Sequence, residues 1–310
     1  MKNNVFQEYF SYLQSVRGLS DRTLVSYKTD LSYFRLYCES KNIEVETSSA
    51  KDLQGFIVFL GTKKLSTVSL NRALSSIRGF YKWLLRFGYR SDDPSVTLRN
   101  RTSHKNLPSF LWEREMAFFA ELPEKTKILW KLRDKALILI MYSAGLRISE
   151  VVSLSINDID FEGEEDIKSA KVTGKGNKER YVFFSSEAFK ALKDYLPERS
   201  GRINAEKNTD KLFISRRGKA LSANGVRWII EKYSKASALE KNIHPHSLRH
   251  SFATHLVNSG CDVRIVQELL GHARISTTQR YAHVDMERLK QVYAKAHPHG
   301  TFEKKLEKTK

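Results

Sequence analysis

Residues 244–260 read HPHSLRHSFATHLVNSG, a stretch in which histidines recur at close spacing around an arginine. Four imidazoles fall within its first twelve residues: His244, His246, His250 and His255. Pro245 suits the first turn of a helix. On such a helix His246 and Arg249, three residues apart, lie on the same face. The stretch therefore predicts a helix that presents an imidazole and a guanidinium together.

Three roles are open for these histidines: a zinc site, packing in a core, and binding of an anion. His246 and His250 have the four-residue spacing of zinc ligands on a helix. The HExxH pattern, however, needs a glutamate where Ser247 stands, and an acidic third ligand is missing nearby. Packing of all four rings would leave the charge of Arg249, on the same face, without a partner. The arrangement therefore favours an anion over a metal cation.

The whole chain carries an excess of positive charge, which also favours an anionic partner. Its 310 residues include 53 Lys and Arg against 35 Asp and Glu, for a formal net charge of +18 and a sequence pI of about 9.7. Such an excess favours a polyanion as partner, either nucleic acid or an anionic membrane surface. A basic but otherwise ordinary enzyme is the alternative that charge alone leaves open.

Other features of the sequence favour a cytoplasmic protein. The first residues, MKNNVFQEYF, lack the apolar core of a signal peptide. Cys38 and Cys261 make neither a disulfide framework nor a CxxC pair, which fits a reducing compartment. The longest apolar run, residues 136–146, has eleven residues. It is too short to span a bilayer and predicts a buried helix, so we expect no membrane partner.

The first hundred residues show helical periodicity and no convincing strand. We expect helices over residues 5–16, 21–41, 51–61 and 67–88. Ser20 and Ser66 suit the N-caps of the second and fourth, and Gly88 suits the end of the fourth. Together they predict a small helical bundle. Its polar faces carry basic side chains, some of which we expect to contact phosphate: Arg17, Arg22, Lys28, Arg72, Arg78, Lys82 and Arg86.

A linker is expected over residues 99–107, within polar sequence that contains prolines and a run of positive charge. It would divide the chain into a helical N-terminal domain, residues 1–98, and a second domain, residues 108–310. In the second domain we expect a helix over residues 131–144 that breaks at Gly145.

Two strands are expected in the second domain. Residues 166–173 and 179–186 flank the sequence GKGNK and predict an antiparallel hairpin with a glycine-containing tip. The rest of the domain has helical character. The fold class predicted for the chain is therefore mainly α, with a small antiparallel β-sheet in its second domain.

Further residues that carry chemistry lie on both sides of the histidine stretch. Arg147 follows the break at Gly145, and Glu150 comes one helical turn later. Lys175 lies at the tip of the hairpin. His272 follows the dipeptide Leu-Gly, and Tyr281 comes nine residues after it. Each of these residues alone is weak evidence for a function. A GKG tip is usually a turn, and this one lacks the spacing of a P-loop. A lone tyrosine is usually a core or surface residue.

The order of these residues is more specific than any one of them. An arginine, a lysine on a hairpin, HxxR, LGH and a tyrosine follow one another over 135 residues. This order resembles the tyrosine recombinase (phage integrase) family. The segments LRISEVVSL, HSLRHSFATHL and ELLGHARISTTQRYAHV are similar to forms seen in bacterial Xer recombinases. The resemblance covers nearly the whole chain and implies six catalytic residues: Arg147, Lys175, His246, Arg249, His272 and Tyr281.

The resemblance implies a site-specific DNA recombinase that cleaves and rejoins DNA through a 3′-phosphotyrosyl intermediate, with no cofactor and no metal. Residues 1–98 would be the core-DNA-binding domain, and residues 108–310 the catalytic domain with a C-terminal inter-subunit tail. The implied partners are a double-stranded DNA recombination site and a homo-tetramer, or a hetero-tetramer with a second recombinase. The implied role is resolution of chromosome dimers, with a septal DNA translocase as a further partner.

The chemistry of a phosphodiester supports this assignment independently. Two guanidiniums can bind its two non-bridging oxygens, and histidines can add hydrogen bonds and move protons near neutral pH. The phenol of Tyr281, with a reference pKa of about 10, needs a base or a cationic pocket to ease its deprotonation. Lys175 could protonate the leaving 5′ oxygen, and Glu150 would orient Arg147 or a histidine. The alternatives are an integrase of a mobile element with the same chemistry and a DNA-binding protein that never cleaves.

The segment from Asp285 onward carries a short apolar stripe made of Leu289, Val292 and Tyr293. This stripe either packs on its own catalytic domain or, as the resemblance suggests, docks into a neighbouring subunit.

Overall fold

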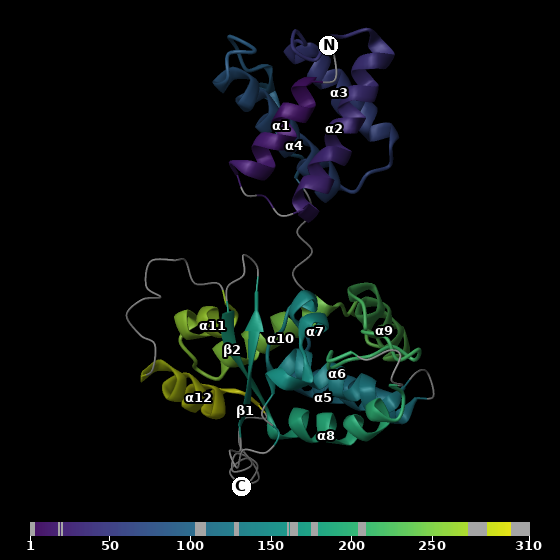
Figure 1. Ribbon diagram of the computed structural model, residues 1–310, viewed down its shortest axis with the longest axis vertical. Helices are drawn as coiled ribbons and strands as arrows, with labels where there is room; N and C mark the ends of the chain where they lie inside the picture. Colours follow the sequence, from purple (N-terminus) through teal and green to yellow (C-terminus); the bar gives the residue numbers. More distant parts are fainter. Residues whose placement is uncertain are drawn as a thin grey trace. The chain divides into compact units, whose positions relative to one another are not determined.

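The computed structural model describes residues 4–17, 19, 21–102, 110–126, 130–159, 161, 167–174, 179–203, 209–271 and 284–298. The chain divides into two compact units, Met1–Lys105 and Asn106–Lys310 (Figure 1). Each has its own hydrophobic core. We call them the N-terminal unit and the C-terminal unit.

The N-terminal unit is a helical bundle. Its elements are α1 (Asn4–Ser15), α2 (Asp21–Lys41), α3 (Ala50–Thr62), α4 (Thr67–Arg86) and the 3-10 helix η1 (Pro94–Thr97). Ser66 caps α4 by accepting a hydrogen bond from the backbone N–H of Ser69. Gly88 follows the end of that helix with a φ of +75°. The expected helices, the Ser66 cap and the glycine stop are confirmed, whereas Ser20 lies outside the described residues.

Aromatic rings fill the core of this bundle. Phe34, Phe56 and Phe80 have no exposed surface. Phe34 of α2 meets Phe56 of α3 edge-on, with ring centroids 5.0 Å apart. Phe6 of α1 stacks on Phe80 of α4 at 4.9 Å. Each such pair adds about 0.5–1.5 kcal/mol beyond the burial of its rings, so these contacts fasten the helices to one another.

The residues that follow η1 also pack on the bundle. Leu98 is buried in its core. The backbone N–H of Arg101 donates to Oδ1 of Asn71 at 2.8 Å, and Nδ2 of Asn71 donates back to the carbonyl of Arg101 at 2.8 Å. Arg78 donates to Oδ1 of Asn100 at 2.7 Å. The first residues of the expected linker are therefore hydrogen bonded to α4.

The C-terminal unit is built around α6. Its elements are α5 (Glu113–Lys125), α6 (Lys131–Ser143), α7 (Ile148–Ser153), the 3-10 helix η2 (Ile156–Asp158), β1 (Lys168–Thr173), β2 (Glu179–Phe184), α8 (Ser186–Ser200), α9 (Ala223–Ala236), α10 (Pro245–Asn258), α11 (Val263–Leu269) and α12 (Val284–Ala296). Residues 136–142 of α6 are all buried, and α5, α8 and α10 pack on this helix. A helix that is apolar on all sides has to be covered by its neighbours. The expected buried helix is therefore confirmed.

The expected hairpin is also present. Strands β1 and β2 are antiparallel, with a register that runs from Lys168 opposite Phe184 to Thr173 opposite Glu179. Its residues 175–178 lie outside the described part of the chain. The expected fold class is confirmed: the chain is mainly α, with a small antiparallel sheet.

The break after α6 requires a glycine. Gly145 has a φ of +55°, and a Cβ at this position would lie 2.5 Å from Cδ1 of Phe252 on α10. A larger residue would therefore meet both backbone strain and a clash. The tight turn that results places Arg147 at the N-cap of α7.

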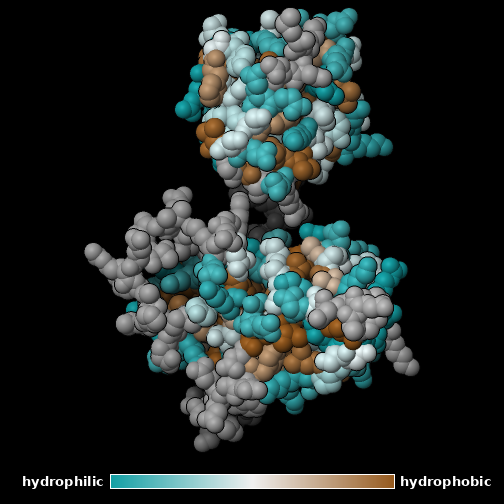
Figure 2. All heavy atoms as spheres, in the orientation of Figure 1, coloured by the Kyte–Doolittle hydropathy of each residue, from teal (hydrophilic) through white to brown (hydrophobic). Residues whose placement is uncertain are grey.

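Figure 2 shows hydrophilic residues over much of the visible face of each unit, with smaller hydrophobic patches between them. Large exposed hydrophobic side chains occur on several separate elements, such as Val58 on α3, Trp228 on α9 and Val257 on α10. None of the described helices is both long enough and apolar enough to cross a membrane.

Candidate active site

Arg147 and Glu150 form the first part of the site. The backbone N–H of Arg147 donates to Oε2 of Glu150 at 2.7 Å, and its Nη1 donates to Oε1 at 2.9 Å. The first bond caps the N-terminus of α7, and the second is an ion pair between the two side chains. Glu150 has no exposed surface, whereas the side chain of Arg147 is 27% exposed. The carboxylate thus orients the guanidinium, as expected, and leaves part of it open to solvent.

Arg249 on α10 lies beside the same carboxylate. Its Nη1 donates to the carbonyl of Gly145 at 2.5 Å, and its Nη2 donates to the carbonyl of Leu270 at 2.6 Å. Nη1 is 3.9 Å from Oε2 of Glu150. The fold therefore brings both of the expected catalytic arginines, Arg147 and Arg249, next to one buried acid.

Burial and charge act in opposite directions on these groups. Burial by itself raises the pKa of Glu150, but hydrogen bonds from Arg180 and Arg147 outweigh it and hold the pKa below its usual value. Burial, followed by repulsion from Arg147, lowers the pKa of Arg249 to about 10, although Glu150 opposes this shift. Near neutral pH both groups are therefore charged.

The four histidines of the motif take different positions. His244 and His246 are exposed at the start of α10, and His246 lies one helical turn before Arg249. His250 is half-buried, with its ring 6.1 Å from that of Phe110. His255 is buried, and its Nδ1 lies 2.7 Å from the hydroxyl of Tyr142. One of the four imidazoles is thus a core residue, and His246 is presented at the surface next to the arginine.

Three of the expected catalytic residues, Lys175, His272 and Tyr281, lie outside the described residues. Their neighbours in sequence are described. Gly174 ends the first half of the hairpin, and Gly271, with a φ of +69°, directly precedes His272. The roles of these three residues therefore stay predictions.

Arg180 was not among the residues predicted from the sequence, although it belongs to the same cluster. Its Nη1 and Nη2 donate to the two oxygens of Glu150 at 2.5 and 2.9 Å. One signal was available in the sequence: side chains alternate along a strand, so Arg180 shares a strand face with Val182 and Phe184. An arginine that points inward needs a buried acidic partner.

The cluster has the electrostatics of an anion site. Among the described residues, three guanidiniums surround Glu150, so three positive charges face one negative charge. Arginine presents several donors in a plane, which suits the oxygens of a phosphate. When one guanidinium balances the charge of Glu150, two positive charges remain. Arg147 is the most exposed of the three arginines.

The basic residues of the N-terminal unit, some of which were expected to contact phosphate, fall into two groups. Arg72 pairs with the buried Asp30 through two hydrogen bonds of 3.0 and 2.8 Å, and Arg78 donates to Asn100. These two arginines are held by the bundle itself. Other members are exposed: Arg17, Lys28, Lys82 and Arg86. The side chain of Arg22 lies outside what the structure describes.

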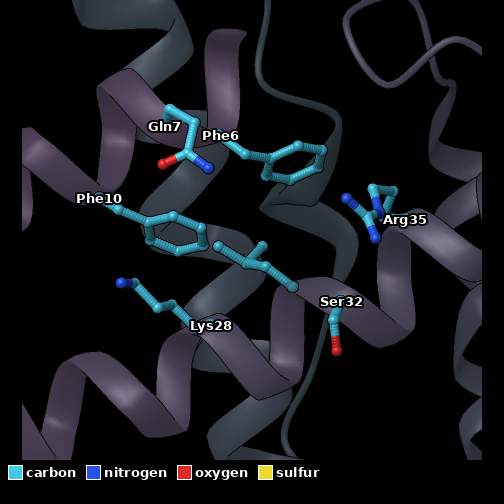
Figure 3. Close-up of a pocket in the computed structure, with 7 residues that line it drawn as sticks. Phe6, Gln7, Phe10, Lys28, Ser32 and Arg35 are labelled. Atoms are coloured by element: carbon cyan, nitrogen blue, oxygen red, sulfur yellow. The ribbon is translucent and has the colours of Figure 1, made fainter. Parts of the chain in front are cut away.

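A shallow pocket lies between α1 and α2 of the same unit (Figure 3). The rings of Phe6 and Phe10 line it, and Lys28 and Arg35 lie beside them. Nζ of Lys28 is 5.5 Å from the centre of the Phe10 ring. The pocket therefore combines aromatic rings with two basic side chains.

The helix α12 packs on its own C-terminal unit. Tyr293 is 1% exposed, and its hydroxyl donates to the carbonyl of Ser143 at 3.0 Å. Leu289 and Val292 pack against the same core. In the single chain the apolar stripe therefore packs on its own C-terminal unit, the first of the two roles considered for it. Docking of a tail into a neighbouring subunit stays a prediction for an assembled protein.

Comparisons with known families agree with this arrangement. Residues 115–288 match the model of the Phage integrase family, and residues 6–88 match that of the Phage integrase, N-terminal SAM-like domain. A curated relative named Tyrosine recombinase XerC, from Treponema denticola, is 40% identical over 308 residues, which cover 96% of this chain and 100% of the relative. A protein named Tyrosine recombinase XerD, from Oceanobacillus iheyensis, is 37% identical and covers 96% of this chain and 99% of its own length.

Solved structures give the same result. A complex of the XerH site-specific recombinase with palindromic difH substrate, captured after cleavage, matches with a TM-score of 0.68 and 27% identity, over 92% of this chain and 84% of that chain. The Tn1549 transposon integrase in complex with a circular intermediate DNA has the same fold, with a TM-score of 0.69 and 19% identity, over 93% of this chain and 98% of that chain. The chain therefore belongs to the phage integrase family, as a tyrosine-type site-specific DNA recombinase of the Xer type.

Proposed function

We propose that this recombinase cleaves and rejoins double-stranded DNA through a 3′-phosphotyrosyl intermediate, with Tyr281 as the nucleophile. The observation that carries the proposal is the placement of Arg147 and Arg249 on one buried carboxylate. Two guanidiniums held in this way are ready to bind the non-bridging oxygens of one scissile phosphate before the reaction begins.

The reaction would proceed by in-line displacement. The phenolic oxygen of Tyr281 attacks the phosphorus, and the bond from phosphorus to the 5′ oxygen breaks. Lys175 gives its proton to that leaving oxygen, and His246 and His272 add hydrogen bonds or accept the phenolic proton. Arg147 and Arg249 stabilise the negative charge that develops on the phosphoryl oxygens. The phosphotyrosyl bond conserves the energy of the broken linkage, so rejoining requires no ATP.

The two units would have different roles on DNA, one in binding and the other in catalysis. Residues 1–98 act as the core-DNA-binding domain, residues 99–107 as the linker, and residues 108–310 as the catalytic domain with its C-terminal inter-subunit tail. In the N-terminal unit, Lys82, Arg86 and the basic rim of the pocket in Figure 3 are exposed and are suited to the phosphate backbone. Neutralisation of several phosphates would make binding strongly dependent on salt.

The assembly would be a tetramer on two recombination sites, which exchanges strands in pairs through a Holliday junction. Relatives named XerC and XerD from Oceanobacillus iheyensis match this chain at 38% and 37% identity. This near equality suits either a homo-tetramer or a hetero-tetramer with a second recombinase. We further propose that the protein resolves chromosome dimers in the cytoplasm and that a septal DNA translocase activates it.

A suicide recombination site tests the proposed chemistry. A nick next to the scissile phosphate lets the cleaved fragment diffuse away and traps the covalent adduct. Peptide mapping should place the DNA on Tyr281, and Tyr281→Phe should bind the same site without forming an adduct. An adduct on Tyr293 or Tyr142 would show that the nucleophile is assigned wrongly, and DNA binding without any adduct would favour a protein that never cleaves.

A further inference from the structure

Arg180 is the second residue of β2, and its side chain is only 12% exposed. Each nitrogen of its guanidinium has an acceptor. Nη1 and Nη2 bind the two oxygens of Glu150, and Nε donates to the carbonyl of Leu269 at 3.2 Å. The two-point contact with a carboxylate is the geometry that a planar guanidinium provides and an ammonium does not.

These contacts join three separate parts of the C-terminal unit. Arg180 lies on the hairpin whose tip carries Lys175, and Glu150 lies on the helix that begins after Arg147. Leu269 ends α11, just before the turn that leads to His272. A single side chain therefore links the segments on which these proposed catalytic residues lie.

The turn after α11 is shaped around Arg180. Gly271 has a φ of +69°, and a Cβ there would lie 2.9 Å from Cδ and 3.2 Å from Nε of Arg180. Arg180 could not move aside without losing its bonds to Glu150 and Leu269. The glycine next to His272 thus fits the space that the arginine leaves.

We propose that Arg180 is a positioning residue for the candidate active site, which holds Glu150 in place between Arg147 and Arg249 and ties the hairpin to the turn before His272. The inference rests on the proposed function. Without Arg180, the buried carboxylate would be balanced by Arg147 and Arg249 alone. Both would be drawn towards Glu150 and away from the phosphate, whose negative charge grows in the transition state. Cleavage should therefore suffer more than DNA binding.

The test compares Arg180→Gln with Lys171→Gln. Lys171 and Glu179 form an ion pair on the same hairpin, with side chains that are 51% and 54% exposed. Both variants remove one positive charge from the hairpin, but only Arg180→Gln removes a contact with Glu150. Gel shifts on a half-site measure binding, and single-turnover reactions on the suicide site measure cleavage.

Arg180→Gln should bind within about threefold of the unchanged protein and cleave about 100-fold more slowly, the loss expected when catalytic groups are misplaced by about 1 Å. Lys171→Gln should stay within about threefold in both measurements, because an exposed ion pair contributes little. Arg180→Lys retains the charge and should recover about tenfold of the lost rate without reaching the full rate, because it lacks the planar fork.

Cleavage by Arg180→Gln within about threefold of the unchanged protein would overturn the proposal, as would an equal loss in Lys171→Gln. If Arg180→Gln fails to fold, as thermal unfolding and half-site binding would reveal, Arg180→Lys decides: full-rate cleavage refutes the proposal, and slow cleavage with intact binding supports it. Failure of the proposed function looks different, because the unchanged protein would then form no adduct at all.

Discussion

Arg147 and Arg249 lie against the same side chain: Arg147 donates a 2.9 Å hydrogen bond to Oε1 of Glu150, and Arg249 is 3.9 Å from Oε2. Glu150 has no exposed surface, so the cost of removing its charge from water has to be offset by these neighbours. The carboxylate in turn keeps several positive charges close together in the absence of DNA. The catalytic chemistry that we propose therefore depends on an acid that takes no part in the bond changes.

The first prediction concerns the stability of this cluster. Glu150→Gln should lower the free energy of unfolding by about 3–5 kcal/mol, because it leaves buried guanidiniums without their counter-charge. Glu179→Gln, which removes the exposed partner of Lys171, should cost less than about 1 kcal/mol. Urea unfolding followed by tryptophan fluorescence measures both, since Trp112, Trp130 and Trp228 all belong to the C-terminal unit. Equal costs in the two variants would contradict the central place of Glu150.

The second prediction concerns the pH dependence of the same contribution. The folded-state pKa of Glu150 is lowered, so its stabilising effect should be fully present above its unfolded value of about 4.3 and decline as pH falls through the folded pKa. A protonated Glu150 resembles glutamine in charge. The difference in unfolding free energy between the unchanged protein and Glu150→Gln should therefore be constant from pH 7 to 5 and shrink towards pH 3. A difference that does not change over this range would mean that the carboxylate is not the origin of the effect.

Local sequence patterns were sufficient to place Arg147 after a helix break and Arg249 on a helix face, whereas their catalytic roles were implied by the resemblance to the phage integrase family. The break at Gly145 is a local property of the backbone, and the HxxR spacing on one helix face needs no knowledge of the rest of the fold. The helices of the N-terminal unit and the hairpin could be predicted for the same reason, because their periodicities are contained within each segment.

Pairings between distant segments could not be predicted in this way. Arg180 contacts Glu150 only in the folded unit, and neither segment contains a pattern that identifies the other as its partner. The packing of His255 against Tyr142 has the same origin, since α6 and α10 become neighbours only in the folded unit. Arg72 was one of seven basic residues of which some were expected to contact phosphate, and its partner in the bundle is the buried Asp30 on another helix. Polar pairs of this kind are specified by tertiary structure.

The third prediction separates the two groups of basic residues in the N-terminal unit. Lys82→Gln and Arg86→Gln, at exposed positions, should weaken half-site binding and reduce the slope of log affinity against log salt by about 0.9 each. Arg72→Gln should instead destabilise the bundle by about 3 kcal/mol, because the buried Asp30 loses its charged partner. Salt titrations of binding and thermal unfolding give the two measurements. A normal salt slope in the Lys82 and Arg86 variants would remove these residues from the DNA interface.

The fourth prediction concerns Lys175. If it is the general acid, Lys175→Ala should slow cleavage of ordinary DNA by about 100-fold or more. A substrate with sulfur in place of the bridging 5′ oxygen needs little protonation of its leaving group, so it should restore much of the lost rate. The matched control is Lys171→Ala on the same hairpin, which should behave alike on both substrates. An equal defect of Lys175→Ala on both substrates would make this lysine a phosphate-binding residue.

The last prediction concerns the C-terminal segment, in which the buried helix and the residues beyond it should behave differently. Tyr293 has its ring in the core and its hydroxyl on the carbonyl of Ser143, two residues before the Gly145 carbonyl that accepts from Arg249. Truncation after Val284 removes this tyrosine and should destabilise the C-terminal unit by at least about 3 kcal/mol, the usual cost of deleting a buried aromatic side chain.

Truncation after Pro298 keeps Tyr293 and removes only residues 299–310, the part of the proposed inter-subunit tail that lies outside the described residues. We expect this shorter deletion to leave stability and half-site binding unchanged and to weaken the cooperative filling of the second half-site. Recombination should fall more than first-strand cleavage, because exchange needs the whole assembly and cleavage needs one site. Gel-shift titrations on half and full sites separate these effects. A second, full-length variant replaces the lysines of residues 299–310 with glutamine. Unchanged cooperativity in both this variant and the truncated protein would show that the tail does not link the subunits.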